Sequence, residues 1–149
     1  MNQTEQSLNT FIQLIRASNK LEKIVRQDVT QYELNITEFA VMELLFHKGK
    51  QTIQVIKEKI LIASSSTTYV IDQLEKKGFV TRQTNVNDKR VTFVVLTEHG
   101  TLLMKEIFPK HAKTITDSMS CLEPNELEQL LKLLAKLNRS LEKSDTRRN

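Results

Sequence analysis

Residues 60–100 read ILIASSSTTYVIDQLEKKGFVTRQTNVNDKRVTFVVLTEHG, and this stretch carries the strongest structural signal in the chain. Near its start are five consecutive hydroxyl side chains, Ser64 to Thr68, after which apolar residues recur at the three- and four-residue spacing of a helix. Gly78 can adopt the left-handed backbone conformation that commonly ends a helix. The pattern therefore predicts a helix over about residues 64–77 with a hydroxyl-rich outer side.

The remainder of this stretch predicts a β-hairpin. Two runs of β-forming residues, 79–83 and 91–96, flank a polar loop that contains Asp88, Lys89 and Arg90. A helix with small hydrogen-bonding side chains suits the major groove of DNA, and a basic hairpin beside it can reach the neighbouring groove. The arrangement needs no catalytic group, and it predicts a protein that reads DNA.

Basic residues are concentrated in the same region. Between Lys76 and Arg90 the chain has five lysines and arginines and a single acidic residue, Asp88, so the net charge of this segment, +4, equals that of the whole chain. Such a cluster can be an ordinary solvated surface. Its position beside the hydroxyl-rich helix favours the alternative, a contact with a polyanion.

The composition indicates a globular protein of a single domain. The chain has 149 residues, of which 39% are hydrophobic and 27% charged. It has no apolar run near the roughly 20 residues that span a bilayer, and its first residues lack the pattern of a signal peptide. A single cysteine, Cys121, excludes an internal disulfide and fits a reducing compartment. We therefore expect a cytoplasmic protein without membrane contact.

The sequence motifs of catalysis are missing. The chain has no glycine-rich phosphate loop, nucleophile elbow or HExxH motif, so we expect neither an enzyme nor a bound cofactor. Glu43 and His47 stand four residues apart and could begin a metal site, but two ligands do not complete one. We predict no metal site.

Apolar residues at helical spacing predict further helices on both sides of this stretch. We expect them over residues 6–32, 37–48, 52–60, 97–119 and 123–142, with Thr37 and Thr52 as caps. Pro109 should kink the fourth of these helices, and the polar tail from Lys143 should be frayed. The fold class is therefore mainly α with a small β-hairpin wing. The apolar stripes of the first and last helices exceed what so small a middle can bury, which predicts a second copy.

The run TYVIDQLEKKGFVTRQTNVNDKRVTFVVLTEHG resembles the recognition helix, wing and following helix of the MarR family of bacterial transcription regulators. Its most specific feature is an Asp-x-Arg at the wing tip, here Asp88 to Arg90, followed by a strand and a Leu-Thr-x-x-Gly motif, here Leu96 to Gly100. The segments LNITEFAVMELLFHKG and IFPKH are similar to the quinone- and hydroquinone-responsive branch of this family. The resemblance covers nearly the whole chain.

The resemblance implies a homodimer that binds double-stranded operator DNA of pseudo-palindromic sequence and represses genes until a small molecule or an oxidant releases it. It also implies one MarR-type domain, residues 1–149, with a helical dimerisation region over about 1–33 and 98–143. A winged helix-turn-helix lobe would occupy about 37–97. Two departures concern the recognition helix: Ala63 stands where many members have a capping Asp, and Tyr69 replaces a common Arg. The operator sequences of other family members therefore cannot be assigned to this protein.

The resemblance, the outward face of the helix and the basic loop together predict a set of DNA-contacting residues. This set comprises Ser64, Ser65, Ser66, Thr68, Tyr69, Gln73, Lys76, Asp88, Lys89 and Arg90. Asp88 stands where the family has an acid that steadies the wing arginine. A minor-groove contact by Arg90 would exploit the negative potential of that groove.

In the family, effectors bind where the dimerisation helices meet the winged lobe, and the preferred effector here is a flat aromatic such as a phenol or quinone. The corresponding residues are apolar and aromatic, as a small-ligand pocket requires. They are Phe11, Ile15, Tyr32, Phe39, Met42, Phe46 and His47. The alternative is that these residues are simply core.

Two other functions remain open at this stage. Cys121 could make the protein a thiol-based redox-sensing repressor, although the acids Asp117 and Glu123 flank it and a semi-buried structural cysteine is the plainer interpretation. The chain could also be a winged-helix module that binds proteins and has lost DNA binding. The hydroxyl-rich helix disfavours this, because protein interfaces more often present exposed aromatics or Met.

Overall fold

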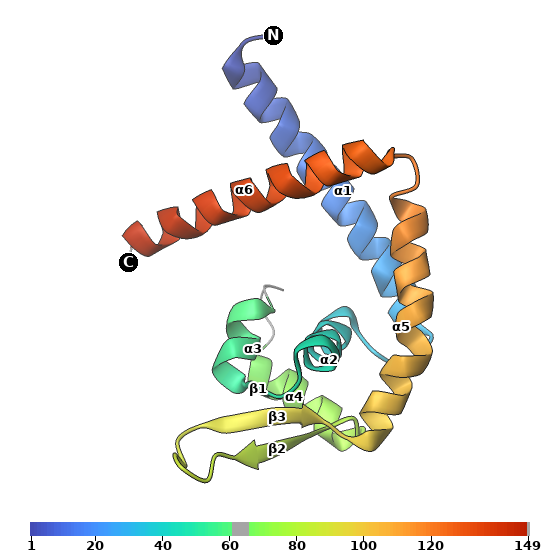
Figure 1. Ribbon diagram of the computed structural model, residues 1–149, viewed down its shortest axis with the longest axis vertical. Coiled ribbons are helices and arrows are strands. Elements are labelled where there is room, and N and C mark those ends of the chain that lie inside the picture. The colour runs from blue at the N-terminus through green and yellow to red at the C-terminus, as the bar shows by residue number, and fades with distance from the viewer. Residues whose placement is uncertain (61–65, 149) are drawn as a thin grey trace. The chain divides into compact units, whose positions relative to one another are not determined.

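The computed structural model describes residues 1–60 and 66–148, so Ala63 and the predicted contacts Ser64 and Ser65 lie outside the described residues. Within them the chain forms six helices and a three-stranded sheet (Figure 1). The elements in chain order are α1 (Gln3–Thr30), α2 (Ile36–Lys48), β1 (Gln51–Thr52), α3 (Ile53–Lys59), α4 (Thr67–Lys76), β2 (Val80–Thr84), β3 (Thr92–Leu96), α5 (Glu98–Ser118) and α6 (Pro124–Arg148). Contacts divide the chain into two compact units, residues 1–112 and 113–149.

Side-chain caps set where α2 and α3 begin. The Glu38 backbone N–H donates to Asn35 Oδ1 at 2.8 Å, and the Asn35 N–H donates to the Glu38 carboxylate at 3.0 Å. This reciprocal capping box satisfies two backbone donors, so the prediction that Thr37 caps α2 is wrong. Thr52 caps α3 as predicted, because its hydroxyl accepts a hydrogen bond from the Val55 N–H at 3.1 Å.

Helix α4 has the predicted inward stripe. Val70, Ile71 and Leu74 are buried, and α4 contacts α2, α3 and β2. Gly78 follows with φ +78°, the left-handed conformation expected at the end of the helix. The predicted start at Ser64 lies outside the described residues, and within them α4 begins at Thr67.

The wing is a three-stranded antiparallel sheet in the order β1-β3-β2. In the predicted hairpin, Val80 pairs with Leu96 and Thr84 with Thr92. The additional strand β1 pairs Gln51 with Val94, which the sequence analysis missed. A two-residue strand has too few side chains to show an alternating pattern.

The core of the first unit joins the winged lobe to the end of α1 and the first part of α5. Its buried apolar residues are Val29, Leu34, Phe39, Val41, Met42, Leu45, Ile56, Val70, Ile71, Leu74, Val80, Val94, Met104 and Ile107. Because α1 and α5 each place residues in this core, the lobe is anchored to both helices.

The Thr and Gly of the Leu-Thr-x-x-Gly motif hold the start of α5 against the turn that follows α4. The Thr97 hydroxyl donates to the Gly78 carbonyl at 2.6 Å and accepts from the Gly100 N–H at 3.0 Å. The Thr97 N–H donates to the Phe79 carbonyl at 3.0 Å. A Cβ added to Gly100 would lie 2.1 Å from the Phe79 carbonyl oxygen. The missing side chain therefore lets α5 begin directly against the turn that follows α4.

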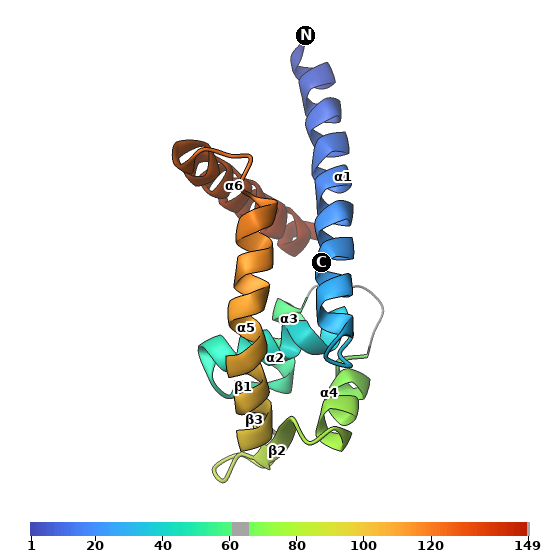
Figure 2. The ribbon, with the colours of Figure 1, turned by 90° about the vertical axis from the view of Figure 1, so that its right-hand side faces the viewer.

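The long outer helices leave much apolar surface uncovered. Of the described residues of α1, Val29 alone is buried, and the N-terminal half of α1 extends beyond the lobe (Figure 2). None of the described residues of α6 is buried. The helix α6 continues to Arg148, so the prediction that the tail frays from Lys143 is wrong. Helix α5 runs unbroken through Pro109.

Among the described helices, none combines the length and apolar character needed to cross a membrane.

Candidate nucleic-acid interface

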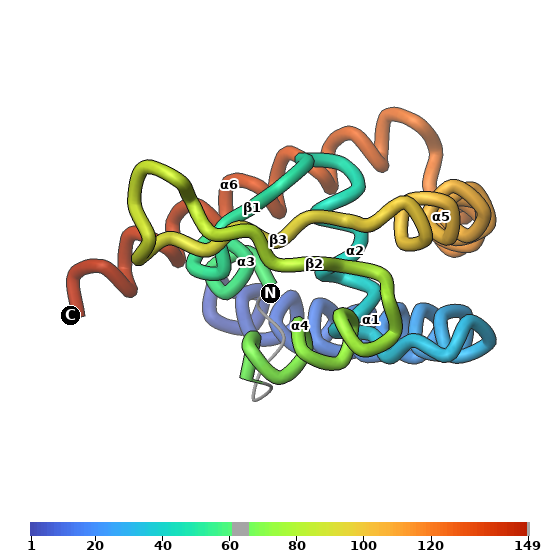
Figure 3. The backbone as a smooth tube through the Cα atoms, turned by 90° about the horizontal axis from the view of Figure 1, so that it is seen from below, coloured from blue at the N-terminus to red at the C-terminus, as the bar shows by residue number. Residues whose placement is uncertain are grey.

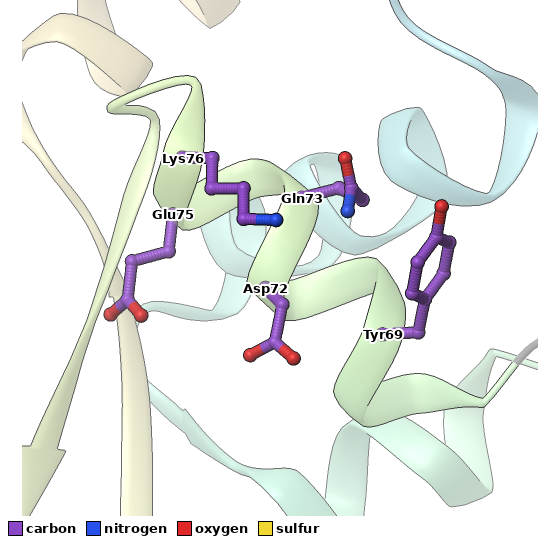
Figure 4. Close-up of a pocket in the computed structure, with 5 residues that line it drawn as sticks. All are labelled: Tyr69, Asp72, Gln73, Glu75 and Lys76. Carbon is purple, nitrogen blue, oxygen red and sulfur yellow. The ribbon is translucent and has the colours of Figure 1, made fainter.

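The outward face of α4 presents most of the predicted base-reading residues that the structure describes. Ser66, Thr68 and Tyr69 are exposed, with 62% of Tyr69 accessible, and Gln73 is half-buried. A shallow hollow of about 410 Å³ lies along this face, lined by Tyr69, Asp72, Gln73, Glu75 and Lys76 (Figure 4). Hydroxyl, phenol and amide groups there can donate to or accept from base edges and phosphates.

Two carboxylates on this face also organise the wing, and the sequence analysis did not assign them a role. Arg82 on β2 donates to Asp72 Oδ1 at 2.6 Å and to Glu75 Oε1 at 2.8 Å. The Arg82 backbone N–H also donates to Glu75 at 3.2 Å. These contacts tie α4 to the second strand, so Arg82 acts within the protein rather than as a free cation.

The basic cluster is therefore less positive than its sequence suggests. Of its five cations, Arg82 is paired with Asp72 and Glu75, Lys77 with Glu38, and Arg90 with Asp88. Within the described part of the chain, Lys76 and Lys89 form no ion pair. Non-specific attraction of DNA should accordingly depend on few charges.

The wing loop is held by its own side chains. The Arg90 guanidinium donates from Nε to Asp88 Oδ1 at 3.0 Å and from Nη2 to Oδ2 at 3.2 Å. The Asn87 N–H donates to Asn85 Oδ1 at 2.9 Å. The side chain and then the backbone N–H of Arg90 hold the pKa of the Asp88 carboxyl below its ordinary value, so the pair stays charged to more acidic pH than a free aspartate would.

This pairing pre-orients Arg90 at the projecting end of the sheet. The loop lies at the end opposite to where β3 leads into α5 (Figure 3). The Arg90 side chain is 90% exposed although it is hydrogen-bonded to Asp88. An exposed guanidinium with a fixed direction can enter a narrow groove at little cost in side-chain entropy.

The predicted effector residues fall into two groups. Phe39 and Met42 are buried in the core, Tyr32 packs against this core, and Phe46 packs edge-on against His47. Phe11 and Ile15 are instead exposed on the part of α1 that extends beyond the lobe, at 61% and 47%. Neither of them belongs to the core cluster or to the apolar residues packed against it.

A polar cluster that the sequence analysis missed lies beside the buried group. His111 on α5 has Nε2 3.4 Å from Glu43 on α2 and Nδ1 3.6 Å from Asp28 on α1. Its ring lies 4.6 Å from that of Phe39. The Nδ1 atom is buried and has no hydrogen-bond partner among the described residues. A lone histidine gives no periodic signal, and only the packing of three helices brings these groups together.

Cys121 lies between α5 and α6 and is a free, exposed thiol. The interpretation of a semi-buried structural cysteine is therefore wrong. Among the described residues, no group of three or more His, Cys, Asp and Glu residues could hold a metal ion.

This fold and this face define the protein as a winged helix-turn-helix DNA-binding protein. The MarR family model matches residues 34–92. The chain is 44% identical over 134 residues to the HTH-type transcriptional regulator MhqR of Bacillus subtilis strain 168, and the match covers 90% of this chain and 92% of that protein. The chain belongs to the MarR family of transcription regulators, which are DNA-binding proteins and not enzymes.

Two solved structures have the same fold. A cysteine-to-serine mutant of E. coli MarR, complexed with operator DNA, has a TM-score of 0.78 at 20% identity, over 92% of this chain and 99% of that one. Bordetella bronchiseptica BpsR, whose DNA binding is regulated by 6-hydroxynicotinic acid, has a TM-score of 0.77 at 22% identity, over 87% of this chain and 98% of that one.

Removing the wing guanidinium tests the wing contact. Arg90→Ala should weaken binding to a duplex selected by the wild-type protein and lower the slope of log K against log salt by about one phosphate contact. The fold should be unchanged because the side chain is exposed. Lys20→Ala, which removes an exposed cation of α1 outside the predicted contact set, is the control for a general charge effect. Equal losses in the two variants would contradict a specific role for Arg90.

Proposed function

We propose that the protein is a homodimeric repressor that acts in the cytoplasm and leaves a pseudo-palindromic operator when a small aromatic effector binds. The DNA-binding part of this proposal is supported by the exposed polar face of α4, which lies beside a wing whose Arg90 side chain is held by Asp88. In this proposal the whole chain is one domain, with residues 1–33 and 98–143 for dimerisation and 37–97 for DNA.

The proposed dimer follows from uncovered apolar surface. On α1 the exposed residues include Leu8 and Phe11, and on α6 they include Leu127 and Leu131. Apolar surface of this kind on each of two helices favours burial against a second copy. A two-fold dimer would place two α4 helices in successive major grooves, roughly 34 Å apart.

The proposed effector site lies around His111. Phe39 and Phe108 supply ring surfaces, since their centroids lie 4.6 Å and 6.3 Å from that of His111. The His111 Nδ1 atom, which lacks a hydrogen-bond partner among the described residues, and the Glu43 carboxylate supply polar groups for a hydroxyl or carbonyl of a phenol or quinone. The regulation of BpsR by 6-hydroxynicotinic acid, a hydroxylated aromatic, supports this chemical class.

Such a ligand can act because its site is built from three helices. His111 belongs to α5, Glu43 to α2 and Asp28 to α1. A molecule that separates these helices shifts the lobe away from the DNA-binding arrangement. For release to occur, the ligand must bind the DNA-free form more tightly than the DNA-bound form.

The test is displacement of the protein from a fluorescent duplex by a series of phenols and quinones. We expect at least one compound to release wild-type protein and the Cys121→Ser variant equally. His111→Phe keeps the ring shape but removes the polar atoms, and it should require up to about tenfold more compound while binding DNA normally. Release lost only in Cys121→Ser would assign the switch to the exposed thiol. Failure of every compound on wild-type protein would remove the effector proposal.

A further inference from the structure

A charged pair ties the end of the recognition helix to the start of α2. Lys77 Nζ donates to both carboxylate oxygens of Glu38, at 2.8 and 3.0 Å, and to the Glu33 carbonyl at 2.8 Å. All three ammonium protons therefore have acceptors. Glu38 is 3% exposed and is the single buried charged residue among the described residues.

The three groups come from three separate parts of the fold. Lys77 is the C-cap of α4, and Glu38 lies in the first turn of α2. Glu33 lies in the turn between α1 and α2 and has φ +59°, a left-handed conformation unusual for this residue type. Glu38 also completes the capping box of α2, so its carboxylate serves α2 and α4 together.

Stability alone does not account for this arrangement. Burying a charge costs free energy that an ion pair only partly returns, and a well-packed apolar pair is often equally stable. The ion pair instead fixes the orientation of the three segments relative to one another, because its hydrogen bonds are all satisfied in only one arrangement of them.

We propose that Lys77 is a positioning residue, which sets the direction of the recognition helix relative to α1 and thereby the half-site spacing that the DNA-bound dimer accepts. This inference rests on the proposed dimer, in which α1 contributes to the interface. The residue acts through Glu38 and the α1–α2 turn and not through a base contact.

Without this ion pair, a small tilt of α4 would displace its free end by about the length of one base-pair step. Helix α4 has ten residues and is therefore roughly 15 Å long. A tilt of about 10° about its anchored C-terminal end would move the opposite end by roughly 3 Å. One base-pair step is about 3.4 Å, so a modest loss of direction corresponds to one base pair of spacing.

The test measures the affinity of each variant for three duplexes. One is a two-half-site duplex selected by wild-type protein from a random-sequence pool, and the others have one base pair added or removed between the half-sites. Lys77→Met and Glu38→Gln should each reduce the preference for the selected spacing by roughly tenfold, with little change in binding to random DNA. Glu38→Gln separates positioning from a phosphate contact, because it leaves the lysine in place.

Two controls keep the result interpretable. Lys76→Met removes the neighbouring cation, which has no ion pair among the described residues, and should preserve the spacing preference while weakening all DNA binding slightly. The double variant Glu38→Gln with Lys77→Met removes both charges, while the glutamine amide oxygen can still accept a hydrogen bond from the Asn35 N–H, so it should fold even if a single variant with one unpaired charge does not. It should also show the reduced spacing preference.

Wild-type spacing preference in the folded double variant would overturn the inference. If wild-type protein is monomeric, or binds the three duplexes with equal affinity, both the proposed dimer and this inference are wrong. A dimer that retains its preference in every variant would overturn the inference alone, so the two failures are distinguishable.

Discussion

Leu131→Asp is expected to abolish specific operator binding while each protomer remains folded. Leu131 is 68% exposed on α6, and none of the described residues of this helix is buried. In an isolated protomer the new carboxylate would therefore stay in water. At an apolar dimer interface it would be buried without a partner, and truncating a central interface residue alone costs about 2 kcal/mol or more.

Two-fold symmetry doubles this cost, because both copies carry the substitution. A penalty of about 4 kcal/mol corresponds to roughly a thousandfold weaker dimer. Sedimentation equilibrium and operator titration would measure the two consequences. Gln129→Asp introduces the same charge two residues earlier, on the opposite side of the helix, and should leave the dimer intact. A Leu131→Asp protein that remains dimeric would remove α6 from the interface.

Gly100→Ala is expected to destabilise the first unit strongly. The added Cβ would lie 2.1 Å from the Phe79 carbonyl oxygen and 2.9 Å from its carbonyl carbon, and backbone atoms cannot move aside as a flexible side chain can. Overpacking typically costs about 1–3 kcal/mol, and contact with backbone places this substitution at or above the upper end. Separation of α5 from the turn would also disturb the Thr97 hydrogen bonds.

Denaturant unfolding of Gly100→Ala, with circular dichroism as the signal, measures this loss. Gly49→Ala is the matched control, because Gly49 has φ +75° but no atom within 4 Å of an added Cβ. With ψ −162°, Gly49 lies in a positive-φ extended region that is essentially restricted to glycine, so the substitution should cost only this backbone strain, about 1–3 kcal/mol. A smaller loss for Gly100→Ala than for Gly49→Ala would contradict the steric explanation of the motif.

Much of the fold could be predicted because local patterns specify local structure. The stripe of Val70, Ile71 and Leu74 and the left-handed Gly78 are both observed. The start of α2 was misassigned although its signal is local. Asn35 and Thr37 can both act as caps, and the decisive feature is that Glu38 stands three residues after Asn35, the spacing of a capping box.

The candidate site was harder to predict where it depends on contacts between distant residues. The sequence shows a run of basic residues, but Arg82 binds Asp72 and Glu75, and Lys77 binds Glu38, which is 39 residues earlier. A count of charges along the chain cannot include such partners. His111 was missed for the same reason, since Asp28 and Glu43 reach it from other helices.

The sequence by itself determined the six helices, the β2–β3 hairpin, the hydroxyl-rich face of α4 and the Asp88–Arg90 wing tip, because each depends on residues close together in the chain. It also determined the membership of a DNA-binding family, through a whole-chain resemblance. Only the tertiary structure decided which charges are free to meet DNA, which aromatic residues are core, and how the end of α4 is joined to α1 and α2. The physical reason is that electrostatic pairing and burial act through space, over a few ångströms, between residues whose separation along the chain carries no signal.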